Sequence, residues 1–311
     1  MKFILQRAGQ GLIVIFAALT LAFILMFVIG DPVTMITGAE ASREQAERLR
    51  EQLGFNRPLI VQYFDFMFGA VQGDFGVSYR HQQPVLPLLW ERLGRSAEIA
   101  LPALFLAILV SVPAGVVSAL RRNTTIDYSA RVTALIGQAA PNFWVGIMLI
   151  VLFSNILGWL PASGREIDGG VGKQLSHMIL PVVTLALMPM AYLTRMMRST
   201  MLEVINEDYI RTARAKGAPV PRVVYIHALR NALIPYVTIT ALQIGNLIAG
   251  SMVVESVFAW PGMGRLLMDS IRQLDIPVVA AGLSLVAALF VILNLIADIC
   301  YALLDPRVGR N

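Results

Sequence analysis

The chain has 311 residues, of which 57% are hydrophobic and only 14% are charged, whereas a soluble domain carries roughly 25% charged residues. This apolar excess excludes an ordinary soluble protein and predicts an all-α integral membrane protein. The formal charge of +5 does not indicate a nucleic-acid partner, because the basic residues lie between apolar segments, as they do in the cytoplasmic loops of membrane proteins. The single cysteine, Cys300, excludes an intrachain disulfide, and the three histidines are too far apart in sequence to suggest a metal site.

Six segments are long and apolar enough to cross a bilayer, whose hydrocarbon core of about 30 Å requires about 20 helical residues. The first exceeds the apolar length of a signal peptide, and Asp31 and Pro32 follow where a cleavage site with small residues would lie. The fourth is short and contains Pro181 and Pro189, so we expect it to be kinked or tightly packed. The predicted spans are Gly11–Ile29, Ala97–Leu120, Val132–Gly158, Met178–Thr194, Leu233–Phe258 and Val278–Leu304.

Basic residues in the short loops predict that both termini face the cytoplasm. With the N-terminus inside, fourteen Lys and Arg residues fall on the inner side and only four on the two short outer loops. The expected organisation is an N-terminus and first span in residues 1–30, an outer segment in residues 31–96, and a transmembrane core in residues 97–311. The longest inner loop of this core covers residues 195–231.

The outer segment is expected to contain a short helix. Ser42 begins a capping box, Glu44 and Arg48 pair at a four-residue spacing, and Gly54 and Pro58 stop the helix. Two interpretations remain open from this pattern. The segment is either a small ordered cap on the outer face or a docking surface for an external partner.

The inner loop, residues 195–231, is too long for a simple turn and predicts a helix, a glycine turn and a second helix. Ser199 or Thr200 is expected to cap the first helix, and Gly217 to end it in a left-handed conformation. The second helix is expected over Arg222–Arg230. The pattern fits a basic helix pair on lipid headgroups as well as a lever that docks on a soluble motor subunit.

Polar residues inside the predicted spans are the candidates for lining a transport path, although hydrogen bonding between helices explains them equally well. Gln138 and Asn142 are expected to share a face of the third span beside Pro141, which is expected to bend the helix. Glu255 and Asp298 lie about one turn from a span end, so we expect them to anchor an interface or pack between helices. The path candidates are Gln138, Asn142, Gln243, Asn246 and Asn294.

Two stretches of the inner loop, Tyr209–Gly217 and His227–Pro235, resemble the coupling loop of dipeptide and oligopeptide permeases of the ABC importer class. The general importer pattern has Glu-Ala-Ala where this chain has Arg211-Thr212-Ala213, while Gly217 and Leu229 fit the pattern. Further similarities extend over nearly the whole chain. They include Gly73-Asp74-Phe75-Gly76 in the outer segment, Trp260-Pro261-Gly262 after the fifth span and Leu304-Asp305-Pro306 at the end.

The resemblance implies a type I ABC importer permease fold in a bacterial cytoplasmic membrane. In this family two homologous permease subunits, usually two different chains, enclose the path, two ATPase subunits dock below, and a substrate-binding protein delivers cargo from outside. The permease itself would hold no catalytic residue, metal or cofactor, because ATP and magnesium bind the ATPase subunits. The cargo stays open among di- and oligopeptides, glutathione and nickel chelates. The implied ATPase-coupling residues are Tyr209, Ala213, Arg214, Ala215, Lys216, Gly217 and Leu229.

Other classes of protein have weaker support in the sequence. The nearest approach to a phosphate-binding loop, around Gly169–Gln174, has neither the first glycine nor the final Ser or Thr of that motif. An ATP-independent channel or secondary transporter would typically show paired repeats with broken helices, and no such symmetry is visible. An intramembrane enzyme is not supported, because no H-E-x-x-H zinc motif is present.

Overall fold

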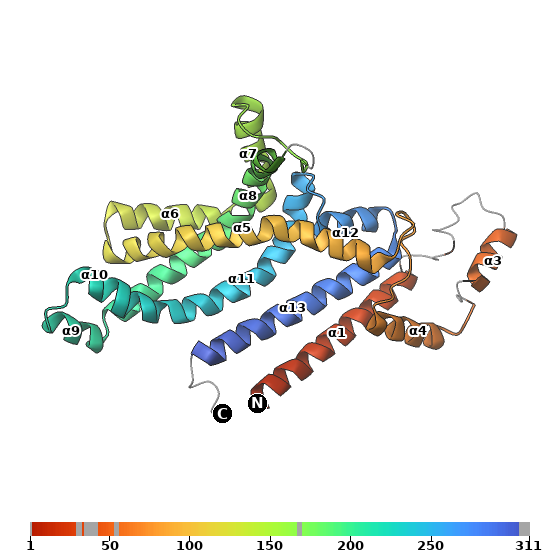
Figure 1. Ribbon diagram of the computed structural model, residues 1–311, viewed down its shortest axis with the longest axis horizontal. Coiled ribbons are helices and arrows are strands. Elements are labelled where there is room, and N and C mark those ends of the chain that lie inside the picture. The colour runs from red at the N-terminus through yellow and green to blue at the C-terminus, as the bar shows by residue number, and fades with distance from the viewer. Residues whose placement is uncertain (1, 29–32, 34–42, 53–55, 167–169, 305–311) are drawn as a thin grey trace. The chain divides into compact units, whose positions relative to one another are not determined.

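The computed structural model describes residues 2–28, 33, 43–52, 56–166 and 170–304 (Figure 1). Every regular element within these ranges is helical, as the composition predicts. The chain forms two compact units. Unit 1 comprises Met1–Arg95 and Pro261–Ile292, and unit 2 comprises Ser96–Trp260 and Leu293–Asn311.

The helices follow the predicted order of apolar segments. The α-helices are α1 (Lys2–Val28), α3 (Arg43–Gln52), α4 (Leu59–Gln72), α5 (Val85–Leu120), α6 (Thr125–Ala139), α7 (Asn142–Leu149), α8 (Gly170–Ile205), α9 (Asp208–Ala215), α10 (Val220–Arg222), α11 (Leu229–Val257), α12 (Met263–Arg272) and α13 (Ile276–Leu304). Two π-helical segments, Ile150–Ile156 and Val223–Ala228, continue α7 and α10.

Each predicted span falls on an apolar helix or on a bent pair of helices. Three helices, α5, α8 and α13, are individually long and apolar enough to cross a membrane. Two bent pairs, Thr125–Ala139 with Asn142–Ile156 and Val220–Gly245 with Gly250–Val257, pass the same test together, and Gly9–Ile24 of α1 is a shorter apolar helix. By length and composition the described residues therefore provide three spans, or up to five when each bent pair is one span, which is consistent with six.

In unit 1, α1 and α4 pack through aromatic side chains. The rings of Phe23 and Tyr63 meet edge to face with centroids 5.2 Å apart, and the Tyr63 hydroxyl lies 2.8 Å from Thr20 Oγ1. On the C-terminal side, Leu267 of the amphipathic helix α12 packs directly against Gly282 of α13. This contact anchors α12 on α13 because glycine leaves room for the leucine side chain.

In unit 2, α6 and α11 lie alongside α8 (Figure 1). One buried cluster centres on Met197 and Met201 of α8 and on Tyr236 of α11. The Tyr236 hydroxyl lies 2.7 Å from Ser111 Oγ of α5, so this polar group is satisfied inside the core. A second cluster includes Phe258 and Trp260, both nearly inaccessible to solvent.

One prediction about the spans needs correction, and two others can be described more closely. In the third span the bend expected at Pro141 is sharp, because α6 and α7 meet at an angle of 104° and Pro141 supplies no backbone N–H to continue α6. The fourth span is not short, since Met178–Thr194 is the apolar middle of the 36-residue α8. The helix of the outer segment ends at Gln52, and its Glu44–Arg48 ion pair is confirmed at 2.6 Å. Ser42 and Gly54 lie outside the described residues.

Candidate functional site: the inner loop and its support

The segment predicted as a coupling loop begins with a break in the helix rather than with a cap. Helix α8 continues through Ser199 and Thr200 to Ile205, so the predicted cap at these residues is wrong. The Thr200 hydroxyl instead donates to the carbonyl oxygen of Met196 at 2.6 Å, an intrahelical bond that Ser and Thr form within helices. After Asn206, Glu207 adopts an extended conformation and α9 starts at Asp208.

Gly217 ends α9 in the left-handed conformation that the sequence predicted. Its φ is +79°. The amide of Ala218 donates to the carbonyl of Ala213 at 3.2 Å, and the amide of Gly217 donates to the carbonyl of Arg214 at 2.9 Å. These two bonds form a Schellman motif, which satisfies the last helix carbonyls and turns the chain sharply.

Helix α9 holds one of its predicted coupling residues against the core and exposes the others. Ile210 is completely buried in the cluster around Met201, and Ala213 packs against the same cluster. Ala213 therefore supports the helix from its buried side. The other predicted coupling residues of this segment belong to the exposed surface of α9 and combine an aromatic ring with cationic side chains; they are Tyr209, Arg214, Ala215, Lys216 and the turn residue Gly217.

The second half of the loop is not the separate short helix predicted over Arg222–Arg230. Pro219 precedes α10, and the chain runs through the π-helical Val223–Ala228 directly into α11. Leu229 is half-buried and packs against the same cluster as Ala213. The Asn231 amide donates to the Tyr209 hydroxyl at 2.7 Å, which links the exposed face of α9 to the start of α11.

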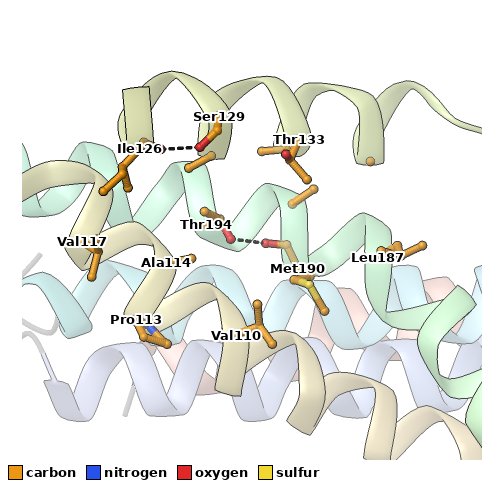
Figure 2. Close-up of a pocket in the computed structure, with 14 residues that line it drawn as sticks. Val110, Pro113, Ala114, Val117, Ile126, Ser129, Thr133, Leu187, Met190 and Thr194 are labelled. Carbon is orange, nitrogen blue, oxygen red and sulfur yellow. Dashed lines mark hydrogen bonds between the residues drawn. The ribbon is translucent and has the colours of Figure 1, made fainter. Parts of the chain in front are cut away.

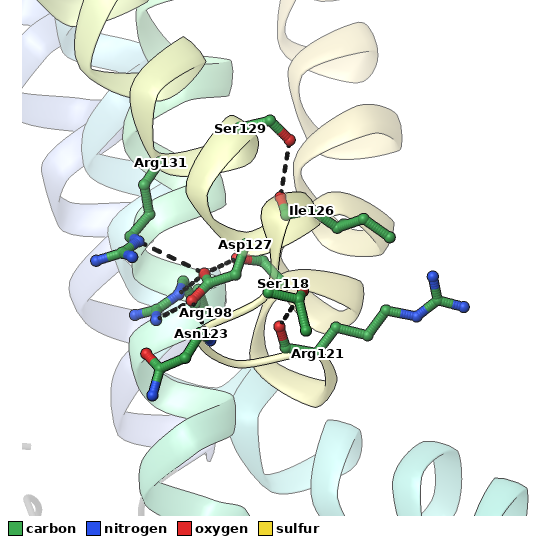
Figure 3. Close-up of polar contacts among 9 residues, drawn as sticks. Ser118, Arg121, Asn123, Ile126, Asp127, Ser129, Arg131 and Arg198 are labelled. Atoms are coloured by element: carbon green, nitrogen blue, oxygen red, sulfur yellow. Dashed lines mark hydrogen bonds and ion pairs between the residues drawn. The ribbon is translucent and has the colours of Figure 1, made fainter.

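Behind this loop lies a buried ion pair that the sequence analysis missed (Figure 3). Asp127 of α6 is fully buried and accepts two hydrogen bonds from the Arg198 guanidinium of α8, at 2.6 and 2.9 Å. The Asp127 carboxylate also accepts hydrogen bonds from Ser118 Oγ at 2.6 Å and from the backbone amide of Asn123 at 3.0 Å. Arg131 Nε lies 3.6 Å from it. A bidentate pair of this kind is strong and geometrically specific, so it fixes α5, α6 and α8 together next to the loop.

The polar residues predicted to line a transport path do not all lie on shared helix faces. Gln138 lies in the last turn of α6 and Asn142 begins α7, so the 104° bend between these helices removes the shared face that was predicted. Asn142 instead lies next to Gly250 of α11. Gln243 and Asn294 are half-buried, and the side chain of Asn246 lies outside the described residues. Whether these residues line a path stays a prediction.

Of the two acidic residues predicted near span ends, the structure describes the side chain of Glu255 only. Glu255 is fully buried, and its carboxylate accepts a hydrogen bond from Ser96 Oγ at 2.6 Å. This contact joins α5 to α11 and agrees with the helix-packing interpretation. The side chain of Asp298 lies outside the described residues.

A groove of about 490 Å³ opens between α5, α6 and α8 (Figure 2). Two of its three hydroxyl groups bond within their own helices, because Ser129 Oγ donates to the carbonyl of Ile126 at 2.9 Å and Thr194 Oγ1 donates to that of Met190 at 2.7 Å. The remaining lining is mostly small and apolar, including Ala114. The groove is therefore chemically unlike the polar path candidates.

On the predicted outer side, Asp275 fixes the turn that precedes α5 within unit 1. Its carboxylate accepts hydrogen bonds from Ser78 Oγ and from the backbone amides of Tyr79 and Arg80. Burial, together with the nearby Asp275 charge, raises the pKa of Tyr79 to about 12, so this phenol is neutral at physiological pH. Among the described residues, no group of His, Cys, Asp and Glu side chains is arranged to hold a metal ion.

Comparison with known proteins identifies the class of this helical membrane protein. Residues 111–310 match the family described as "Binding-protein-dependent transport system inner membrane component". Residues 1–100 match the corresponding N-terminal family of such membrane components. The chain therefore belongs to the family of inner membrane permease components of binding-protein-dependent transport systems, and it is an ABC importer permease subunit.

Curated relatives match over their full length. The oligopeptide transport system permease protein AppB of Bacillus subtilis is 43% identical, with 98% of each chain covered. The dipeptide transport system permease protein DppB of Escherichia coli K12 is 38% identical, covering 100% of this chain and 99% of its own. The crystal structure of an amino acid ABC transporter with histidines aligns with 71% of this chain and 94% of its own chain at 16% identity and a TM-score of 0.48. Family membership implies ATPase and substrate-binding partners and a location in the inner membrane.

Proposed function

We propose that this chain forms half of the translocation path of a peptide importer and couples that path to ATPase subunits through α9 and its glycine turn. The relatives named as oligopeptide and dipeptide permeases support a peptide cargo over glutathione or nickel chelates. The second permease subunit is a homologous but different chain. The path residues are drawn from the half-buried polar groups around Asn142 and Gln243.

The exposed face of α9 is the observation that carries the coupling role. Helix α9 has only eight residues, too few for stability in isolation, yet it is held by the buried Ile210, by the Tyr209–Asn231 hydrogen bond and by the Schellman turn. A short helix fixed at three points, with an aromatic ring and basic side chains exposed, suits recognition by a soluble partner. The break at Asn206–Glu207 sets it apart from α8.

In this function the chain carries out no covalent chemistry, and the partner ATPase subunits bind ATP and magnesium. The test is reconstitution in proteoliposomes of this chain with its partner permease and two ATPase subunits. Uptake of a labelled dipeptide should require ATP and the liganded binding protein, and this chain alone should neither hydrolyse ATP nor transport. Flux through this chain alone, unaffected by ATP, would indicate a channel instead.

The orientation is part of the proposal, with both termini and α9 in the cytoplasm. Single cysteines replace Glu51 of α3 and Arg214 of α9, both exposed, in a Cys300→Ser background. A membrane-impermeant thiol reagent, given access through any outer membrane, should label Glu51→Cys in intact cells and Arg214→Cys only after lysis. The reverse pattern would invert the topology.

A further inference from the structure

A polar pocket of about 240 Å³ lies within unit 1, between α12 and the N-terminal part of α5. Its lining includes Arg92 of α5, His81 of the preceding turn, and Gly262, Arg265 and Asp269 at the start of and along α12. By the proposed orientation all of these residues face the outside of the cell. None of them belongs to the coupling loop or to the path candidates.

Charge and hydrogen bonding in the pocket favour an anion. Arg92 and Arg265 are permanent cations, whereas Asp269 is the one acidic residue of the lining and lies 3.6 Å from Arg265 Nε. The Arg92 guanidinium donates to the carbonyl of Pro261 at 3.2 Å, which fixes its position. Its Nε is buried and finds no hydrogen-bond acceptor in the described part of the chain. A buried donor without an acceptor is costly, and an incoming acceptor would remove that cost.

The pocket runs along the side of α12, because its lining extends from Gly262, the N-terminal cap of this helix, to Gln273, its C-terminal cap. Since both ends of the helix border the pocket, the preference for an anion comes from the two guanidinium groups. In the turn before α5, the amide of His81 donates to Ser78 Oγ at 2.9 Å, and Ser78 donates in turn to the Asp275 carboxylate, so His81 is held in position.

We propose that this pocket receives an Asp or Glu side chain of the cognate substrate-binding protein. The inference rests on the proposed function, since it needs a binding protein that docks on the outer face. A carboxylate fits because guanidinium groups bind it through paired, directional hydrogen bonds. The modest positive excess of two Arg against one Asp suits a single carboxylate rather than a multiply charged anion.

The experiment uses the complete importer in lipid nanodiscs and measures the Kd of its cargo-loaded binding protein at several salt concentrations. Arg92→Ala should raise this Kd by roughly tenfold or more and weaken its dependence on salt, because a steering charge is lost. Asp269→Asn should lower the Kd severalfold, since it removes the acidic group that repels an incoming carboxylate. Arg57→Ala is the charge-matched control, because Arg57 pairs with Asp65 on the exposed surface of the same unit and does not line the pocket.

The gain expected from Asp269→Asn separates carboxylate binding from a structural role of Arg92, because a merely destabilised pocket would not bind more tightly. A reversed charge at Arg92→Glu should be rescued by changing one Asp or Glu of the binding protein to Arg, which identifies the contact. Unchanged Kd values for both Arg92→Ala and Asp269→Asn would overturn the inference while leaving the proposed function intact. A wild-type importer that binds no substrate-binding protein would instead refute both.

Discussion

Replacing Gly217 by valine tests the coupling role of α9 most directly. At φ +79° an ordinary L-residue costs roughly 1–2 kcal/mol, and a β-branched residue lies at the upper end of that range. A Cβ atom at Gly217 meets no described atom within 4 Å, so the penalty comes from the backbone alone and not from a clash. The undocked variant can relieve this strain by leaving the left-handed conformation, whereas docking requires that conformation. The full penalty then appears in binding, and the affinity for the ATPase subunits should fall by roughly 5- to 30-fold, since 1.4 kcal/mol corresponds to a factor of ten.

The assay is co-purification of the ATPase subunits with the tagged permease, with peptide uptake measured in the same cells. Gly217→Val should be expressed and inserted normally, yet lose ATPase binding and uptake together. Gly217→Asn should keep most of both, because Asn tolerates the left-handed conformation. Gly172→Val is a matched control, since Gly172 is also exposed and unobstructed but lies in a helix with negative φ. Full ATPase binding and uptake by Gly217→Val would show that α9 is not the motor contact.

Two further predictions concern stability, measured as the thermal unfolding midpoint of the purified protein in detergent. Asp127→Asn leaves the largely buried Arg198 without its charge partner and should cost about 3–5 kcal/mol, whereas Asp208→Asn, in an exposed pair on α9, should change little. An equal midpoint for both variants would contradict the structural role of Asp127. Gly115→Ala would place a methyl group 2.9 Å from a backbone oxygen of α8 and should cost about 1–3 kcal/mol by overpacking. Gly94→Ala, on the same helix but unobstructed, should be neutral or stabilising by up to about 1 kcal/mol, and a loss there would contradict this reasoning.

The parts of this fold that follow from local chemistry could be predicted from the sequence. Apolar runs of about 20 residues fix the positions of the spans, and Gly217 followed by Pro219 fixes the end of α9. The start of α9 could not be predicted, because Leu202 and Ile205 continue the same helical spacing across the break. From this periodicity the end of α8 and the whole of α9 were therefore predicted to be a single helix.

The buried ion pair could not be predicted because its partners are 71 residues apart in sequence. Asp127 and Arg198 each look like an ordinary charge of an inner loop, and only tertiary packing buries them. The short basic loop between two spans offered one signal, since Asp127 is the only acidic residue among the basic residues Arg121, Arg122 and Arg131. An isolated carboxylate in such a loop is a reasonable candidate for a structural ion pair.

The contacts within unit 2 give a physical reason why docking of an ATPase subunit at α9 should move the membrane helices. Only two residues, Asn206 and Glu207, separate α9 from α8, and the buried Ile210 packs α9 against the same cluster as Met201. A force on α9 therefore acts on α8 without a flexible linker to absorb it. Within α8, Arg198 passes that force to α6 through Asp127, whose carboxylate also bonds α5 through Ser118. A docked ATPase subunit that moves α9 should therefore displace α8, α6 and α5 together, because the Asp127–Arg198 ion pair and its Ser118 hydrogen bond connect these three helices.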